Sequence, residues 1–204
     1  MRRLLALTGL ATLGAALWWR KNPSACPYSQ RLFIELPHPG ITRGRLIEIL
    51  APRAGERVLE IGPGTGYYTF EMAARLDGGQ VDIFDIQQEM IDHVVREANR
   101  RGVTNVNPAL GDAQSLPYRN ESFEAVVLIT VLGEIPDQER ALNEVARVLK
   151  PGGRLIVGEM IVDPHTVTLG QLRERAGRAG LSLARRIGGP MAFFARLEKA
   201  PVAG

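Results

Sequence analysis

Three glycines at alternate positions, Gly62, Gly64 and Gly66, follow the apolar run at 57–61 and precede a helical pattern. A strand, a glycine-rich turn and a helix in this order present a cluster of backbone N–H groups that a nucleotide-bearing ligand can approach closely. Glycine is needed there because a Cβ would block the approach. Asp85 ends the next predicted strand, 23 positions after Gly62, where a carboxylate can accept hydrogen bonds from two ribose hydroxyls. The spacing predicts a site for an adenosine-containing cofactor.

The residue at position 67 separates two classes of cofactor. A dinucleotide-binding turn has the pattern Gly-x-Gly-x-x-Gly/Ala, which requires a small residue there, whereas this chain has Tyr67. A nicotinamide-dependent oxidoreductase would also need a hydride-transfer arrangement such as a Tyr-x-x-x-Lys pair, and the sequence contains none. The sequence therefore argues against that class of enzyme.

The elements that must position these residues alternate between helical and strand patterns from Ile41 onward, which is typical of a doubly wound α/β sheet. Parallel strands are predicted at 57–61, 81–84, 106–110, 125–130 and 154–157, with helices at 43–50, from the glycine turn to about 76, and at 88–101, 138–149 and 169–179. Pro108 predicts that the third strand lies at an edge of the sheet, because proline has no N–H for the ladder. Two further strands, 183–187 and 192–197, predict an antiparallel hairpin after the parallel part.

Four segments, in their order along the chain, resemble the motifs of class I S-adenosylmethionine-dependent methyltransferases. VLEIGPGTGYYT is similar to the first motif, DIFDIQQEM to the second, GDAQSLPYRNESFEAVVL to the third and fourth, and LKPGGRLIVGE to the segment that leads into the fifth strand. The resemblance covers about 41–198. It implies a Rossmann-like seven-stranded sheet of order 3-2-1-4-5-7-6 with an antiparallel C-terminal hairpin. That order places the third strand at an edge, as Pro108 independently requires.

The resemblance also implies the cofactor, S-adenosyl-L-methionine, and a set of residues that bind it. This set is Glu60, Gly62, Gly64, Gly66, Asp85, Ile86, Asp112, Ala113 and Thr130. Glu60 and the three glycines would hold the methionine part of the cofactor. Asp85 would bind the ribose hydroxyls, and Ile86 would contact the adenine. The following Asp-Ala pair would hold the adenine amino group, and the threonine would line the wall next to the sulfonium. A turn-forming role is the alternative interpretation for the second aspartate.

Methyl transfer from a sulfonium is an in-line displacement whose neutral thioether leaving group needs no acid, so much of the rate can come from positioning. A base is needed only where the acceptor must lose a proton early. Candidate bases on predicted loops are Tyr28, His38, Glu134, Asp137 and His165. His38, in LPHPG, is the first to test, with a structural or merely exposed histidine as the alternative.

Composition excludes several classes of protein. The 204 residues are 45% hydrophobic and 23% charged, which excludes disordered and fibrous chains. The net charge is only +3, and the arginines are spread over helix faces without an aromatic–basic stripe, so nucleic acid is not an expected partner. A single cysteine, Cys26, and three scattered histidines exclude an internal disulfide and predict no metal site.

The uncharged run at 4–19, LLALTGLATLGAALWW, is flanked by basic residues on both sides. As a helix its 16 residues would extend about 24 Å, short of the roughly 30 Å hydrocarbon core of a bilayer. The signals for cleavage are poor, so we expect residues 1–21 to be a retained membrane anchor, spanning or lying in one leaflet. A hydrophobic helix packed on the globular domain is the alternative. Prolines in 22–40 predict a linker that becomes a cover for the site, and 41–204 form the methyltransferase domain.

These expectations combine into a hypothesis about function. The third and fourth motifs are similar to those of quinone-biosynthesis methyltransferases, so we expect a small hydrophobic or amphiphilic acceptor (a lipid amine, a quinone or phenol, or a thiol) at a membrane surface. The domain would face the cytoplasm, where the cofactor is made. PRAGERVLEIGPGTGYYT is also similar to the first motif of protein isoaspartyl methyltransferases, so a protein carboxyl acceptor is one alternative. A membrane-tethered module that binds the cofactor without catalysis is another.

Overall fold

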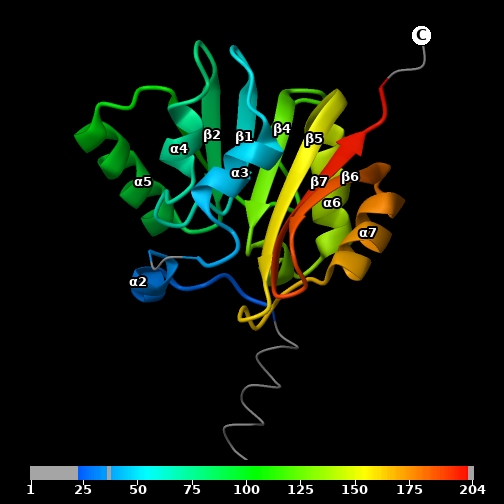
Figure 1. Cartoon of the computed structure of the whole chain (residues 1–204). Coiled ribbons are helices and arrows are strands. Elements are labelled where there is room, and N and C mark those ends of the chain that lie inside the picture. The colour runs from blue at the N-terminus through cyan, green and yellow to red at the C-terminus, as the bar shows by residue number, and fades with distance from the viewer. Residues whose placement is uncertain (1–22, 36–37, 202–204) are drawn as a thin grey trace, which may run out of the picture.

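A computed structural model describes residues 23–35 and 38–201. Its centre is a seven-stranded sheet of order β3-β2-β1-β4-β5-β7-β6 (Figure 1). The strands are β1 (Arg57–Ile61), β2 (Gln80–Asp85), β3 (Val106–Leu110), β4 (Phe123–Ile129), β5 (Leu149–Met160), β6 (Leu181–Gly188) and β7 (Ala192–Lys199). The first five are parallel to one another, and β7 lies antiparallel between β5 and β6. The expected sheet is thereby confirmed, including the edge position of the strand that contains Pro108.

Helices cover both faces of the sheet. They are η1 (Tyr28–Gln30), α2 (Arg31–Ile34), α3 (Arg43–Leu50), α4 (Thr69–Ala73), α5 (Gln88–Arg101), η2 (Leu132–Glu134), α6 (Gln138–Val148) and α7 (Leu169–Arg178). One apolar core lies between the sheet and α6 and α7, and the other lies between the sheet and α3, α4 and α5. In the central strand β4, Val126 and Leu128 enter the first core while Ala125 and Val127 enter the second. This strand is buried on both faces, as the continuous apolar run of a parallel strand requires.

Three elements differ from the expectation. The helix after the glycine turn ends at Ala73 rather than near 76. Strand β5 begins at Leu149, because its first residues pair with β4 across a register shift, and Gly152 there adopts a φ of +72°. The segment 22–40 was expected to be extended, but η1 and α2 lie within it. No proline interrupts the residues between Pro27 and Pro37, so helical turns can form there.

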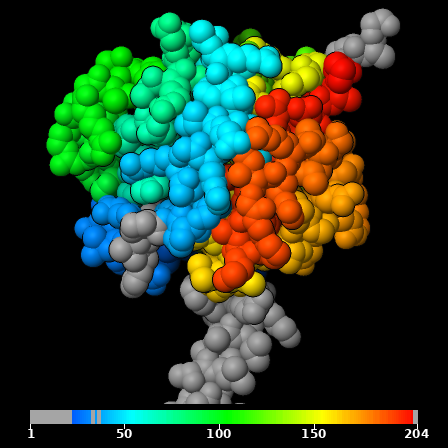
Figure 2. All heavy atoms as spheres, viewed as in Figure 1, coloured from blue at the N-terminus to red at the C-terminus, as the bar shows by residue number. Residues whose placement is uncertain are grey.

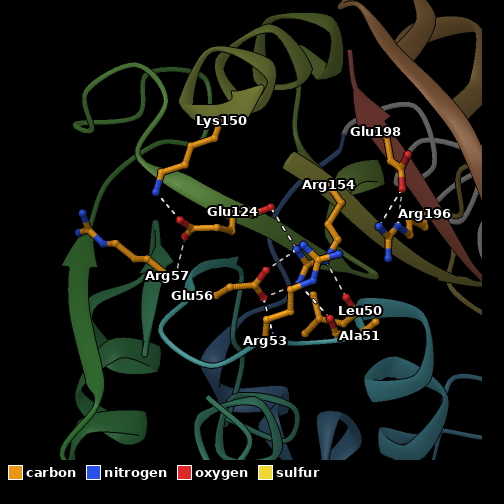
Figure 3. A network of polar contacts seen from close by, with 10 residues as sticks. All are labelled: Leu50, Ala51, Arg53, Glu56, Arg57, Glu124, Lys150, Arg154, Arg196 and Glu198. Carbon is orange, nitrogen blue, oxygen red and sulfur yellow. Dashed lines mark hydrogen bonds and ion pairs between the residues drawn. The ribbon is translucent and has the colours of Figure 1, made fainter. Parts of the chain in front are cut away.

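A buried ion pair joins the amino-terminal ends of the strands on the side away from the glycine turn (Figure 3). Nη1 and Nη2 of Arg154 donate to Oε1 and Oε2 of Glu56 at 2.9 and 2.6 Å. Nε of Arg154 donates to the carbonyl oxygen of Leu50 at 2.6 Å, at the end of α3. Glu124, paired with Lys150, accepts a hydrogen bond from the backbone N–H of Arg57 nearby. The network therefore ties β1, β4, β5 and α3 together.

Replacing Arg154 with methionine should strongly destabilise the protein, because it leaves the Glu56 carboxylate buried without its partner. Losing one member of such a pair costs about 3–5 kcal/mol. Chemical denaturation of the full chain measures this free energy of unfolding. The control is Arg178→Met, which breaks ion pairs with the exposed Glu139 and Glu174 and should cost about 1 kcal/mol or less. Equal losses in the two variants would contradict this role for the network.

Candidate cofactor and acceptor site

A cavity of ≈ 520 Å³ lies beyond the carboxyl-terminal ends of β1, β2, β4 and β5. In a parallel α/β sheet this is the crevice where ligands bind. Its walls are the glycine turn and the segments that follow β2, β3, β4 and β5, and residues 23–26 and His38 cover it from the amino-terminal part of the chain. The connections after the parallel strands therefore build the site, while the strands themselves supply its floor.

The glycine turn has the backbone conformation that its sequence indicates, and it approaches neighbouring side chains closely. Gly62, Gly64 and Gly66 have φ values of +69°, +55° and +82°, a region that favours glycine. A Cβ on Gly62 would lie 2.4 Å from Cγ2 of Val131, and a Cβ on Gly66 would lie 2.6 Å from Cε2 of Phe70. Gly62 and Gly64 line the cavity. Gly66 instead packs against Phe70 of α4, so its contact with the cofactor stays a prediction.

Glu60 lies beneath the cavity rather than in its wall. Its carboxylate accepts a hydrogen bond of 2.5 Å from the hydroxyl of Thr69. Burial raises the pKa of Glu60 to about 7, although the hydrogen bond from Thr69 opposes the rise, and the charge of Asp85 contributes. Direct contact between Glu60 and the methionine part of the cofactor stays a prediction.

Asp85 is placed as the ribose-binding role requires. It ends β2, is buried, and lines the cavity. Its Oδ1 accepts a hydrogen bond of 2.8 Å from the backbone N–H of Gln87, which fixes the carboxylate at the carboxyl-terminal end of β2. Burial raises the pKa of Asp85 to about 6. Ile86 also lines the cavity and is mostly exposed, so its apolar face is available to an adenine ring.

The other implied contacts with the cofactor also reach the cavity. Asp112, Ala113 and Thr130 all line it. The Asp112 carboxylate accepts hydrogen bonds from the backbone and the side-chain amide of Gln114, at 2.8 to 3.0 Å, so an adenine amino group would share or displace that amide. Thr130 has a φ of +55°, and its N–H donates to the carbonyl oxygen of Gly158 at 2.8 Å, which turns the chain out of β4 at the cavity wall.

The five candidate bases separate into two groups. His38, Glu134 and His165 line the cavity. Asp137 instead caps α6, where its side chain accepts a hydrogen bond from the backbone N–H at position 140. The hydroxyl of Tyr28 lies 3.1 Å from Nδ1 of a histidine on α5, and Tyr28 is not a cavity residue.

The segment 23–30 is held across the cavity by hydrogen bonds at both ends of the site. The N–H of Cys26 donates to Oε2 of Glu134 at 3.3 Å. The side chain of Gln87 donates to the carbonyl oxygen of Cys26 at 2.9 Å and accepts from the N–H of Tyr28 at 3.1 Å. Residues Pro23 to Cys26 and Gln30 line the cavity. Gln87 had no role in the sequence interpretation. Its side chain joins this segment to the chain that leaves β2 after Asp85.

Sequence reasoning largely missed the buried carboxyl groups at this end of the sheet: Glu134 and Asp163 line the cavity, and Glu159 lies near both without lining it. Burial raises the pKa of Glu134 to about 8, and it raises the pKa of Glu159 to about 8 as well. Burial also raises the pKa of Asp163, which follows β5. Glu159 and Asp163 gave no sequence signal, because it is the fold that brings the end of β5 next to η2, which carries Glu134. No lysine or arginine among the described residues lines the cavity.

Two other expectations concern membranes and metals. The proposed anchor at 4–19 lies outside the described residues. Within 23–35 and 38–201, no helix combines the length and the apolar character needed to cross a bilayer. The same residues hold no group of three or more histidine, cysteine, aspartate or glutamate side chains that could bind a metal ion.

Comparison with known proteins agrees with this geometry. Residues 58–153 match the family model described as "Methyltransferase domain". A "Ubiquinone/menaquinone biosynthesis C-methyltransferase UbiE" from Teredinibacter turnerae is 40% identical over 116 residues, which are 55% of this chain and 46% of that protein. The protein of the same name from Ruegeria sp. is 32% identical over 126 residues, which are 61% of this chain and 50% of that protein. The chain spans about half the length of the curated relatives it matches.

Solved structures show the same fold at low sequence identity. A structure titled as a SAM dependent methyltransferase from Aquifex aeolicus has a TM-score of 0.78 at 18% identity, covering 85% of this chain and 99% of that one. The structure of the [4+2]-cyclase SpnF has a TM-score of 0.70 at 20% identity, covering 78% and 80%. Because that title names a different reaction, the fold alone does not decide the chemistry.

Residues 58–153 match a methyltransferase domain. The relatives, and the solved structures with the same fold, support an enzyme that transfers methyl groups with S-adenosylmethionine as its cofactor. The site fits that cofactor. Gly62 and Gly64 bring the backbone of the turn to the cavity wall, and Asp85 lines the same cavity with a carboxylate that could accept the ribose hydroxyls.

The affinity for S-adenosylmethionine should fall as the pH falls through the raised pKa of Asp85, about 6. Above that pH the carboxylate is ionised and accepts the ribose hydroxyls. Below it, protonation removes the acceptor, so the Kd should rise by about tenfold per pH unit. Calorimetric titration between pH 5 and pH 8 measures this. Asp85→Asn should bind weakly and lose this pH dependence, whereas Asp92→Asn, on the exposed side of α5, should behave as wild type. An unchanged pH slope in Asp85→Asn would contradict the assignment.

Proposed function

We propose that this protein transfers a methyl group from S-adenosylmethionine to a small hydrophobic or amphiphilic acceptor at a membrane surface, with its catalytic domain on the cytoplasmic side. The observation that carries the proposal is the composition of the cavity beyond the cofactor residues. Its acceptor side is lined by apolar side chains and by carboxyl groups, without a cation among the described residues: Ile129, Val131, Glu134, Ile135, Met160, Val162 and Asp163.

The absence of lysine and arginine from this wall, among the described residues, restricts the charge that the acceptor can carry. An anionic group buried there would lack a cationic partner, and an unpaired buried charge is costly. The carboxyl groups of Glu134 and Asp163, whose pKa values burial raises, supply no positive charge to an anion in either protonation state. The part of the acceptor that enters the cavity is therefore uncharged or cationic. A quinol ring, a phenol, a thiol and an amine all satisfy this condition.

Among these acceptors we favour a quinol ring. The support is the similarity to relatives at 31–40% identity, which are quinone-biosynthesis C-methyltransferases. When bound, the cofactor supplies an electrophilic methyl group on a sulfonium. The chain would then contribute positioning: Asp85 and the glycine turn hold the cofactor, and the apolar wall holds the ring in line with the methyl group while excluding water.

The membrane surface is supported by apolar side chains exposed around the open end of the cavity. Ile161, Val162 and Met191 are 58%, 78% and 71% exposed, and Val162 also lines the cavity. The N–H of Ile161 donates to the carbonyl oxygen of Met191 at 2.8 Å, which joins the loop after β5 to the β6–β7 turn. Figure 2 shows these two segments, yellow and orange-red, together at the lower edge of the molecule. Pro23, the first described residue, lines the cavity, and in the sequence it follows the uncharged run at 4–19 by four positions.

Methyl transfer is tested by incubating the full chain with methyl-labelled S-adenosylmethionine and one acceptor at a time. The acceptors are a polyprenyl naphthoquinol, phosphatidylethanolamine, a long-chain alkyl thiol and an isoaspartyl peptide. Label should enter the quinol, because its uncharged ring matches the wall. Label in the peptide alone would favour a protein carboxyl methyltransferase. Cofactor binding without transfer to any acceptor would favour a non-catalytic binding module.

Membrane contact is tested by co-sedimentation of the full chain with phosphatidylethanolamine–phosphatidylglycerol vesicles. Replacing Val162 and Met191 with serine should lower partitioning by about 30-fold, since each side chain contributes about 1 kcal/mol when partly inserted. The control is Leu110→Ser, which removes a side chain that is 51% exposed on the edge strand β3 and should change nothing. If deletion of residues 1–21 left both vesicle binding and activity unchanged, the membrane-surface proposal would fail.

A further inference from the structure

A histidine and a tyrosine that lie 30 residues apart in the sequence form a hydrogen-bonded pair at the cavity. Nδ1 of His38 lies 3.3 Å from the hydroxyl oxygen of Tyr68. The same hydroxyl lies 2.6 Å from the carbonyl oxygen of Ile41, in a buried contact. The His38 ring also meets the edge of the Tyr67 ring, with centroids 5.1 Å apart. The imidazole is therefore held in position by two aromatic neighbours.

The directions of these two hydrogen bonds follow from the number of protons available. A tyrosine has one O–H, and a carbonyl oxygen can only accept. The proton of Tyr68 therefore points to Ile41, and the hydroxyl oxygen accepts from His38. Nδ1 of His38 must then carry a proton. In a neutral imidazole this leaves the lone pair on Nε2, because only one ring nitrogen is protonated.

The surroundings favour the neutral form of His38. Burial lowers the pKa of His38 from its ordinary value of 6.5, and burial raises the pKa of Tyr68, so its hydroxyl keeps its proton. The groups that face the pair are the phenol of Tyr67, the guanidinium of Arg43 on the far side of Tyr67 at 3.8 Å from that ring's centroid, and Glu60 below Tyr68. His38 lines the cavity. Among the described residues, Nε2 of His38 has no hydrogen-bond partner.

We infer that His38 is the general base of the methyl transfer, acting through Nε2, and that Tyr68 is the positioning residue that holds its tautomer; the inference rests on the proposed function. As the bond between the acceptor atom and the methyl carbon forms, the S–C bond breaks and its electron pair stays on sulfur, which becomes a neutral thioether. The proton that the acceptor loses moves to Nε2: it comes from the acceptor oxygen, nitrogen or sulfur when that atom is methylated, and in C-methylation of a quinol from the ring carbon that has received the methyl group, which restores the aromatic ring. The resulting imidazolium then releases that proton to water.

Two carboxyl groups of the cavity are less suited to this task. Glu134, with a pKa of about 8, holds its own proton at neutral pH and also accepts the N–H of Cys26. Asp85 accepts the N–H of Gln87 and is assigned to the ribose. His38 lines the cavity. Because its proton lies on Nδ1, in the hydrogen bond to Tyr68, its lone pair is on Nε2.

The tautomer can be measured without cofactor or acceptor. Nitrogen-15 NMR of the histidine rings in the full chain, which has three histidines, should show His38 neutral at pH 7 with its proton on Nδ1. In Tyr68→Phe both tautomers should become populated, because the acceptor for Nδ1–H is gone. A proton on Nε2 in the wild-type protein, or a charged ring at pH 7, would overturn the inference.

The base is tested by kcat at saturating S-adenosylmethionine with the polyprenyl naphthoquinol as acceptor. His38→Asn keeps an N–H donor toward Tyr68 but has no basic nitrogen, so kcat should fall by about 100-fold or more. The Kd for S-adenosylmethionine should not change. The fall in wild-type kcat at low pH, as the imidazole becomes protonated, should disappear in the variant.

The controls distinguish the base from a structural role. His93→Asn, on α5, should retain wild-type kcat and pH dependence. Thermal unfolding checks that His38→Asn is folded. A folded His38→Asn with wild-type kcat and an unchanged pH profile would remove His38 as the base. Failure of every acceptor in the panel would instead contradict the proposed function, while the NMR spectrum would still decide the tautomer.

Discussion

The site depends on how closely the turn after β1 approaches the chain that leaves β4. A Cβ on Gly62 would come within 2.4 Å of the Val131 side chain. The two connections therefore lie so close together that only glycine fits at position 62. Thr130, with its positive φ, turns the chain out of β4 at this point. Because β1 and β4 are parallel neighbours, the gap between their exits is the crevice of the doubly wound fold. The cavity continues from there to Asp85 on one side and to Glu134 on the other.

Burial then sets the electrostatics of the site. The pKa values of Asp85 and Glu134 rise to about 6 and about 8, chiefly because burial disfavours the charged carboxylate. The two groups accordingly differ in state at neutral pH: Asp85 is largely ionised and can accept hydroxyl groups, whereas Glu134 holds a proton. The only strongly buried arginine pair, Arg154 with Glu56, lies at the opposite ends of the strands among the described residues (Figure 3). The buried ion pair thus stabilises the fold at the amino-terminal ends of the strands, whereas the cavity lies at their carboxyl-terminal ends.

Much of the fold could be predicted because it depends on local patterns. The apolar run at 57–61 and the edge position of Pro108 follow from composition and from the chemistry of proline, and the strand order follows from the family resemblance. The short helices η1 and α2 were missed because the flanking prolines dominate that region. Within the site, Gly62, Asp85 and Thr130 could be placed in advance. The pairing of His38 with Tyr68 could not, because it depends on how the segment before α3 folds back over the glycine turn.

The most direct test of this account is the binding of S-adenosylhomocysteine and NAD to Gly62→Ala, measured by calorimetry. Gly102→Ala is the matched control, because Gly102 has a similar φ of +67° but no atom within 4 Å of the added Cβ. The account predicts micromolar binding of S-adenosylhomocysteine, and none of NAD, by the wild-type protein and by Gly102→Ala, with binding lost in Gly62→Ala. Unchanged binding by Gly62→Ala, or binding of NAD in place of S-adenosylhomocysteine, would contradict it.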